Sequence, residues 1–298
     1  MHQNKHTHIP VLLDEVLKYL VPQRGETYLD LTAGYGGHAS AVLERTLQYK
    51  TSVLVDRDQV AVDALHARFD EQAPRIIHAD YLAVAQRFKA EQRKFDLILA
   101  DLGLSSIHLD EPGRGFSINL DGPLDMRMDQ RQTLNAAGIV NVYSADDLAD
   151  ILRRYGDEPK ARKIARLIVE NRPINSTAQL AAVVSRAWPG HSRVHPATRT
   201  FQALRIAVND ELGQLEKAMP LWLDLLAPNG RIAVISFHSL EDRLVKQMFA
   251  ERSQNVYEAS LRLLTKRPVA ASPQELVFNP RARSAKLRAA VKIKKEME

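Results

Sequence analysis

The sequence predicts an α/β protein in which a doubly wound sheet of parallel strands is interrupted by an all-helical subdomain. Three observations support this prediction. Strand-like and helix-like stretches alternate over residues 27–100, and only helical patterns occur over residues 144–209. A helix followed by a buried strand then returns after residue 211.

In the first part of the chain, short β-branched or apolar runs alternate with segments whose apolar residues recur at helical spacing. The predicted strands are Thr27–Leu31, Thr51–Val55, Arg75–His78 and Phe95–Ala100. The predicted helices between them are His38–Leu47, Gln59–Phe69 and Ala83–Ala90. This alternation is typical of right-handed βαβ units.

The middle of the chain lacks strand signals. Asp110–Met128 is rich in Gly, Pro and Asp and predicts a long, structured loop. Ser144 is expected to cap the first of the helices that follow. These helices are predicted at Ala145–Tyr155, Pro159–Glu170, Thr177–Ala187 and Pro196–Val208. We therefore expect a discontinuous main domain, residues 1–108 and 209–298, with an insertion at residues 109–208.

The last part of the chain predicts that the sheet resumes. A helix at Glu211–Leu226 and a turn at Pro228–Gly230 precede a buried strand at Arg231–Phe237. A further helix is expected at Ser239–Phe249, with Ser239 as its cap. Ala285–Ile293 is the last strand candidate.

Composition and charge narrow the class of protein. The 298 residues include no cysteine, which excludes disulfides, thiol nucleophiles and thiolate metal sites. The ten histidines lack metal-ligand spacing, so no metal is expected. No apolar run approaches the ~18 residues of a membrane span, and a soluble, cytoplasmic protein is expected. Residues 240–298 carry 13 Lys+Arg and 7 Asp+Glu, a net charge of +6, which fits either a polyanionic partner or a solvated surface.

The strongest local motif is the segment Asp30–His38, in which an acidic residue ends a strand and glycines open a helix. Gly34 and Gly36 allow a ligand to approach bare backbone, although a tight turn alone would also need them. The next strand ends at Asp56, 20 residues after Gly36, where a carboxylate can bind ribose hydroxyls. Asp56 or Asp58 could instead cap the following helix. The pattern predicts a nucleoside cofactor.

The acidic strand end favours S-adenosylmethionine over a dinucleotide. Asp30 suits a cationic ligand with an amino group and is out of place beside a pyrophosphate. Asp80 and Tyr81, after the third strand, could meet an adenine. We therefore expect a methyltransferase, with an NAD-dependent oxidoreductase as the alternative.

Catalytic candidates follow the fourth strand, in a loop that faces the reactive end of a cofactor in this fold. Asp101, Ser105 and Ser106 could accept the N–H bonds of an aromatic amine and so localise its lone pair. The serines could equally cap a helix. The Asp-Pro-Pro-Tyr-like tetrapeptide of DNA amino-methyltransferases is absent, which disfavours a DNA substrate.

Two basic segments are candidates for RNA binding. Arg199 and Arg205 could hold phosphates while Phe201 stacks on a base, unless this is an ordinary amphipathic helix with Phe201 in the core. On a strand, Arg281 and Arg283 would share a face and could form a phosphate-binding ridge or a solvated edge. His238, between Ser236 and Asp242, could line the site or be a satisfied buried histidine.

Taken together, these segments resemble the RsmH (MraW) methyltransferases nearly from end to end. The resemblance is carried by motifs that include His8–Leu13, Asp56–Asp58, Asp101–Ser106, Arg114–Ser117, Gly122–Asp129, Tyr155–Glu158, His195–Val208, Ile235–Arg243 and Asn279–Arg288. Gly122–Asp129 and His195–Ala203 are long and unusual, so chance similarity is excluded.

The resemblance implies a seven-stranded, Rossmann-like methyltransferase sheet with a helical insertion that recognises RNA. It implies methylation of the exocyclic N4 of a decoding-site cytidine in the 16S rRNA of the small ribosomal subunit. It also assigns cofactor contacts to Gly36, Gly37, His38, Asp56, Tyr81, Asp101 and His108. His108 stands where the family often has an amide, and Tyr81 where many members have Phe. A homodimer stays open, as does a non-catalytic, RNA-binding assembly factor.

Overall fold

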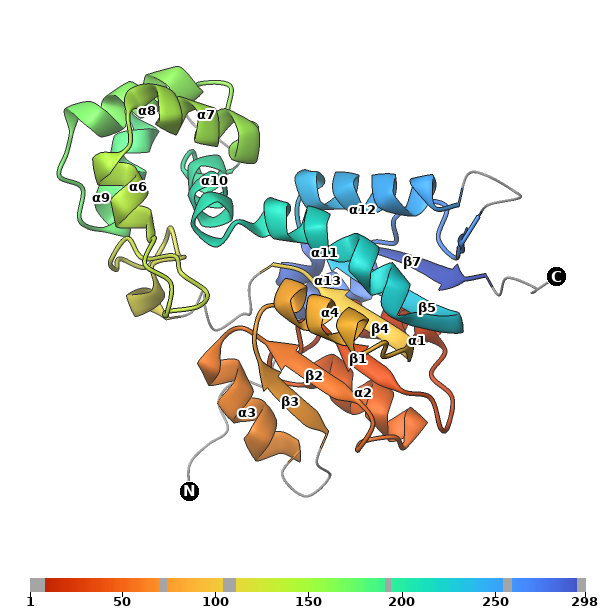
Figure 1. Cartoon of the computed structure of the whole chain (residues 1–298). Helices are drawn as coiled ribbons and strands as arrows, with labels where there is room; N and C mark the ends of the chain where they lie inside the picture. Colours follow the sequence, from red (N-terminus) through yellow and green to blue (C-terminus); the bar gives the residue numbers. More distant parts are fainter. Residues whose placement is uncertain (1–8, 70–73, 104–110, 191–193, 254–258, 294–298) are drawn as a thin grey trace. The chain divides into compact units, whose positions relative to one another are not determined.

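A computed structural model describes residues 9–69, 74–103, 111–190, 194–253 and 259–293 (Figure 1). The chain forms two compact units, residues 1–103 with 213–298 and residues 104–212. We call them the sheet unit and the helical unit and describe each by itself.

The sheet unit contains a seven-stranded sheet in the order β3-β2-β1-β4-β5-β7-β6 (Figure 1). The strands are β1 (Tyr28–Asp30), β2 (Val53–Asp56), β3 (Arg75–His78), β4 (Phe95–Asp101), β5 (Leu226–Ser236), β6 (Leu261–Leu263) and β7 (Lys286–Lys292). Strands β1 to β5 are parallel, whereas β7 is antiparallel to both β5 and β6. This topology confirms the predicted doubly wound α/β fold.

The helices of this unit cover both faces of the sheet. They are α1 (Leu13–Leu20), α2 (Gly37–Thr46), α3 (Gln59–Phe69), α4 (Tyr81–Ala90), α11 (Glu211–Leu225), α12 (Ser239–Glu251), α13 (Pro273–Phe278) and the 3₁₀ helix η2 (Pro280–Ser284). Because strand side chains alternate between faces, Leu29 packs in a core with Phe88 and Trp222, while Tyr28 packs in a second core with Val16 and Leu43.

Two local predictions for this unit need correction. His238, and not Ser239, caps α12, because its Nδ1 accepts from the backbone of Glu241 while the Glu241 carboxylate accepts from the backbone of His238. Arg281 and Arg283 lie in η2, where three residues complete a turn, so they do not share a strand face.

The helical unit holds η1 (Pro112–Arg114), α6 (Ala136–Val142), α7 (Ala145–Gly156), α8 (Ala161–Glu170), α9 (Thr177–Ser185) and α10 (Thr198–Asn209). Four of these helices match the four predicted segments. Ser144 caps α7 by accepting from the backbone N–H of Asp147, as expected. Apolar faces of α6 to α10 pack into one core of their own.

The long loop before α6 is built into that core. Leu124, Met126 and Met128 are buried in it. A Cβ on Gly122 would lie 1.9 Å from the carbonyl oxygen of Pro112, so only glycine fits at this close approach. Packing of this loop accounts for much of the unusual Gly122–Asp129 motif.

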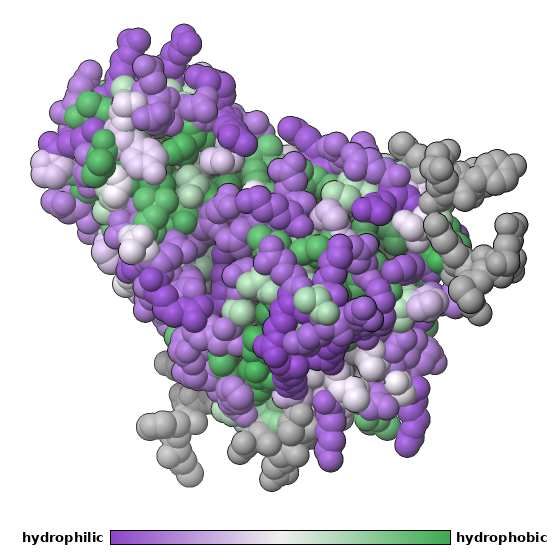
Figure 2. All heavy atoms as spheres, in the orientation of Figure 1, coloured by the Kyte–Doolittle hydropathy of each residue, from purple (hydrophilic) through white to green (hydrophobic). Residues whose placement is uncertain are grey.

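No helix among the described residues is both long and apolar enough to span a lipid bilayer. On the face drawn in Figure 2, hydrophilic residues cover most of the surface and hydrophobic residues lie interspersed among them.

Candidate functional site

Three carboxylates end neighbouring parallel strands of the sheet unit. Asp56, Asp30 and Asp101 are the last residues of β2, β1 and β4, which lie side by side in the sheet. The carboxyl edge of a parallel sheet is where ligands bind in this class of fold. The structure therefore brings together the acidic residues that the sequence placed in one site.

The glycine loop between β1 and α2 is held by Asp56. Its Oδ2 accepts a hydrogen bond from Gly34 N at 2.8 Å, and its Oδ1 accepts from Asp58 N at 2.9 Å. Gly36 has φ of 77°, and a Cβ there would lie 2.8 Å from Cε2 of Phe69. Gly36 is therefore required by both its backbone conformation and its packing. Asp58 accepts from Val60 N at the start of α3, so the capping role belongs to Asp58.

Asp30 is buried, with 1% of its surface exposed. The hydroxyl of Tyr28 donates to its Oδ2 at 2.7 Å, and Thr32 N donates to its Oδ1 at 3.2 Å. Burial raises the pKa of Asp30 to about 7, since these two hydrogen bonds, which lower it, only partly offset the lost hydration. This position corrects the expectation that Asp30 meets an amino group, because its carboxylate is covered.

Asp101 is the more accessible of these two carboxylates, with its side chain 20% exposed. Its Oδ1 lies buried without a hydrogen-bond partner among the described residues. Its backbone N–H donates to Thr32 Oγ1 at 2.6 Å. Burial and, secondarily, the nearby charges of Asp30 and Glu241 hold the pKa of Asp101 well above its usual range.

His38 faces Asp101 from the first turn of α2. Its Nδ1 lies 3.8 Å from Asp101 Oδ2, and its Nε2 lies 2.9 Å from the carbonyl oxygen of Val11. Because a carbonyl can only accept, Nε2 carries the proton in the neutral ring and Nδ1 presents a lone pair to Asp101. A proton at either Asp101 or Nδ1 therefore favours this contact.

Glu241, within the predicted helix Ser239–Phe249, belongs to the electrostatic environment of Asp101, a role that the sequence did not indicate. Its Oε2 accepts from Phe237 N at 2.9 Å, and its Oε1 lies 3.2 Å from His238 Nε2. Glu241 raises the pKa of Asp101 through its charge. The signal in the sequence was an acidic residue five positions after Ser236, the last residue of the buried strand β5.

Of the remaining cofactor candidates, the structure describes Tyr81 and Gly37. Tyr81 is 8% exposed and packs its ring against the edge of Trp222, with ring centroids 5.2 Å apart. Gly37 opens α2, and a Cβ there would lie 3.2 Å from Pro10. Ser105, Ser106 and His108 lie outside the described residues.

The candidate RNA-binding residues differ in burial and in pairing. Phe201 is buried in the core of the helical unit, so its ring is not available for base stacking. Arg205 forms a two-pronged ion pair with Glu211, at 2.8 and 2.9 Å. The alternative of an amphipathic helix with Phe201 in the core therefore describes α10. Arg199, Arg281 and Arg283 are exposed.

These residues fit S-adenosylmethionine better than a dinucleotide. A nucleoside could lie against Gly36, with Asp56 at the end of the second strand, as in other nucleoside-binding sheets. The side chain of Asp101, which is 20% exposed, suits a hydrogen-bond donor or a cation.

Comparison with known proteins gives one consistent result. The model of the MraW methylase family matches residues 5–293. A ribosomal RNA small subunit methyltransferase H from Cyanothece sp. is 50% identical over 287 residues, covering 96% of this chain and 95% of the relative. Another of that name, from Acidobacterium capsulatum, is 47% identical and covers 96% of this chain and 98% of the relative.

Among solved structures, an rRNA methylase from Streptococcus thermophilus is similar to this chain, and the match covers 95% of this chain and 94% of the methylase. Its TM-score is 0.43 and its sequence identity 9%, so the assignment rests on the family match alone. That match confirms the predicted enzyme class, a methyltransferase, and S-adenosylmethionine as its cofactor. The NAD-dependent alternative is thereby excluded. This chain belongs to the MraW methylase family.

Proposed function

We propose that this protein transfers a methyl group from S-adenosylmethionine to the exocyclic N4 of a decoding-site cytidine in the 16S rRNA of the small ribosomal subunit. The observation that carries the proposal is the family match over residues 5–293. Relatives named as small-subunit rRNA methyltransferases support the RNA substrate. The partly exposed carboxylate of Asp101 at the carboxyl edge of the sheet supports an amine acceptor.

When bound, S-adenosylmethionine supplies a methyl group on a positively charged sulfonium. The protein's part is then mainly alignment, since methyl transfer is an in-line displacement. The carboxylate of Asp101, whose side chain is 20% exposed, accepts an N–H of the cytosine amine and orients its lone pair. This role requires ionised Asp101, and its raised pKa makes the reaction faster as the pH rises.

The other assignments are part of the same proposal. Gly36, Gly37 and Asp56 hold the nucleoside of the cofactor, with Tyr81 nearby at the end of β3. His38 borders the cofactor site beside Asp101. The target cytosine leaves its stack to reach the methyl group.

The helical unit and the exposed Arg199, Arg281 and Arg283 contact RNA phosphates. Ser105, Ser106 and His108 remain candidates from the sequence, whereas Phe201 and Arg205 are withdrawn because of their burial and pairing.

The test is to incubate the protein with methyl-labelled S-adenosylmethionine and undermethylated small subunits, then identify the modified nucleoside by mass spectrometry. Asp101→Asn is compared with Asp63→Asn, which alters an exposed carboxylate on α3. Label on N4 of cytidine, lost only in Asp101→Asn, supports the proposal. Label on another nucleoside refutes the target. Cofactor binding without any label would indicate an RNA-binding assembly factor instead.

A further inference from the structure

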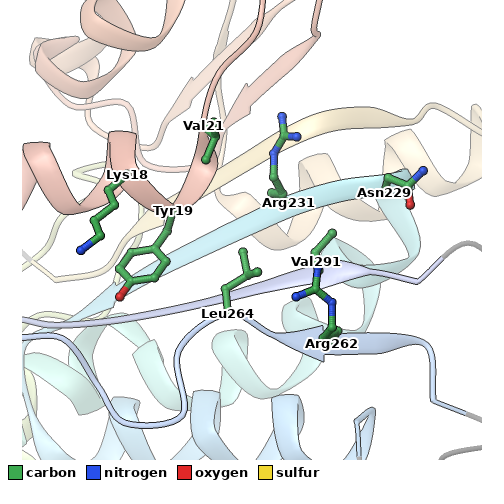
Figure 3. Close-up of a pocket in the computed structure, with 8 residues that line it drawn as sticks. All are labelled: Lys18, Tyr19, Val21, Asn229, Arg231, Arg262, Leu264 and Val291. Atoms are coloured by element: carbon green, nitrogen blue, oxygen red, sulfur yellow. The ribbon is translucent and has the colours of Figure 1, made fainter.

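The sheet unit has a pocket of about 370 Å³ that the proposed methyl-transfer site does not use (Figure 3). Asn229 and Arg231, in the first half of β5, line it. Asp101 instead pairs with Ile235, near the carboxyl end of β5. The pocket and the Asp101 site therefore lie toward opposite edges of the sheet.

The register of three strands places two arginines on one face of the pocket. Arg231 on β5 pairs with Val291 on β7, and Val291 pairs with Arg262 on β6. Directly opposed residues of antiparallel strands share a face. Arg231 and Arg262 thus flank one valine in the sheet.

Helix α1 leaves this part of the sheet open. The same sheet face continues through Ala233 and Ala289, which are buried in the core beside α1. Helix α1 has only eight residues and ends at Leu20. From its last turn, Lys18 and Tyr19 border the pocket (Figure 3).

The lining is cationic. Lys18, Arg231 and Arg262 contribute three positive charges, and no acidic residue is among the eight described residues of the lining. Both carboxylate oxygens of Glu26 accept from Nη2 of Arg231, which offsets the charge of Arg231, and Nε of Arg231 is buried. Lys18 and Arg262 have no ion pair among the described residues. Such a set of donors fits a phosphate group.

Apolar and aromatic groups complete the pocket. The ring of Tyr19 and the side chains of Leu264 and Val291 lie beside the cations (Figure 3). A flat ring can stack on tyrosine, and the volume falls within the range of small-ligand sites. We propose that this pocket binds a nucleotide, with its phosphate on Arg262 and its base against Tyr19, while Lys18 and Arg231 add to the positive potential of the pocket.

The nucleotide comes either from solution or from an RNA strand, and calorimetry can separate these sources. The probes are uridine 5′-monophosphate, uridine and a uridine hexanucleotide, each titrated with S-adenosylmethionine present so that the cofactor site is filled. The paired substitution Lys18→Gln with Arg262→Gln removes two cations from the pocket. Lys246→Gln with Arg252→Gln, on exposed residues of α12 and its end, makes the same charge change elsewhere.

We expect uridine 5′-monophosphate to bind one-to-one and uridine to bind about tenfold more weakly, because charged hydrogen bonds to the phosphate are lost. The pocket variant should bind the nucleotide about tenfold more weakly, and the control variant should bind like the wild type. Arg262→Lys should recover part of the affinity, which separates loss of charge from misfolding.

A hexanucleotide that binds more tightly than the mononucleotide, with a salt dependence weakened in the pocket variant, identifies RNA as the source. Equal or weaker binding identifies the free nucleotide. Equal binding of uridine and its monophosphate, equal losses in the pocket and control variants, or no binding of any probe would overturn the proposal. None of these outcomes depends on methyl transfer.

Discussion

The buried carboxyl group of Asp30 should make the stability of the sheet unit depend on pH. Burial is the main cause of its raised pKa, about 7 against an ordinary value of 3.8. A raised folded-state pKa means that the folded protein favours the protonated form. The contribution to the unfolding free energy is therefore fully present below pH 4 and is lost as the pH rises through 7.

The magnitude follows from the size of the shift. About three pKa units correspond to about 4 kcal/mol, at about 1.36 kcal/mol per unit. Between pH 5 and pH 8, this relation predicts a loss of about 2.5 kcal/mol in the wild type. Asp30→Asn cannot ionise, so its unfolding free energy should rise by about this amount relative to the wild type over the same range.

The assay is urea unfolding monitored by tryptophan fluorescence in a Trp188→Phe background. Trp222 is then the single tryptophan of the 298 residues, and it is buried in the core of the sheet unit. Asp63→Asn removes an exposed carboxylate but keeps Asp30, so this control should show the same pH dependence as the wild type. A difference between Asp30→Asn and the wild type that stays constant from pH 5 to pH 8 would refute the reasoning.

Three further predictions concern single side chains. Asp101→Asn should lower the single-turnover rate of methyl transfer by about a hundredfold at saturating cofactor, and a change below threefold would contradict the proposed role. Gly36→Ala should weaken S-adenosylmethionine binding about tenfold in calorimetry, because φ is 77° and the Cβ contacts Phe69. Gly113→Ala, where a Cβ meets nothing within 4 Å, should bind normally. Asn209→Ala should destabilise the helical unit by about 2–3 kcal/mol, seen through Trp188 fluorescence in urea, since three backbone contacts are lost.

Local patterns predicted most of the regular structure. Helix α3 and strand β3 begin and end at the predicted residues. Helix α1 was not predicted because the sequence carries no capping signal at its ends. Its flanking residues, Leu12 and Val21, both adopt left-handed backbone conformations without a side-chain cap. Its position depends on packing against β5 and β7, which are distant in the sequence.

The candidate site was predictable where strand ends carry acidic residues. Asp30, Asp56 and Asp101 follow buried runs, and parallel strands bring such ends to one edge. Their protonation could not be predicted in the same way. Glu241 acts on Asp101 from 140 positions along the chain, and only folding brings these charges close together.

For the basic residues too, the sequence did not indicate which side chains would be paired and which would be exposed. Arg199 and Arg205 lie on one helix, yet Arg205 is paired with Glu211 while Arg199 is exposed. Arg231 and Arg262 are 31 positions apart and meet through the register of β5, β7 and β6.

The order of elements, the enzyme class and the acidic strand ends follow from the sequence alone, because hydrophobic periodicity and motif spacing are properties of neighbouring residues. Burial, ion pairing, pKa shifts and the cationic pocket depend on the folded chain. They are set by contacts between residues that are far apart in the sequence, and no local pattern specifies those contacts.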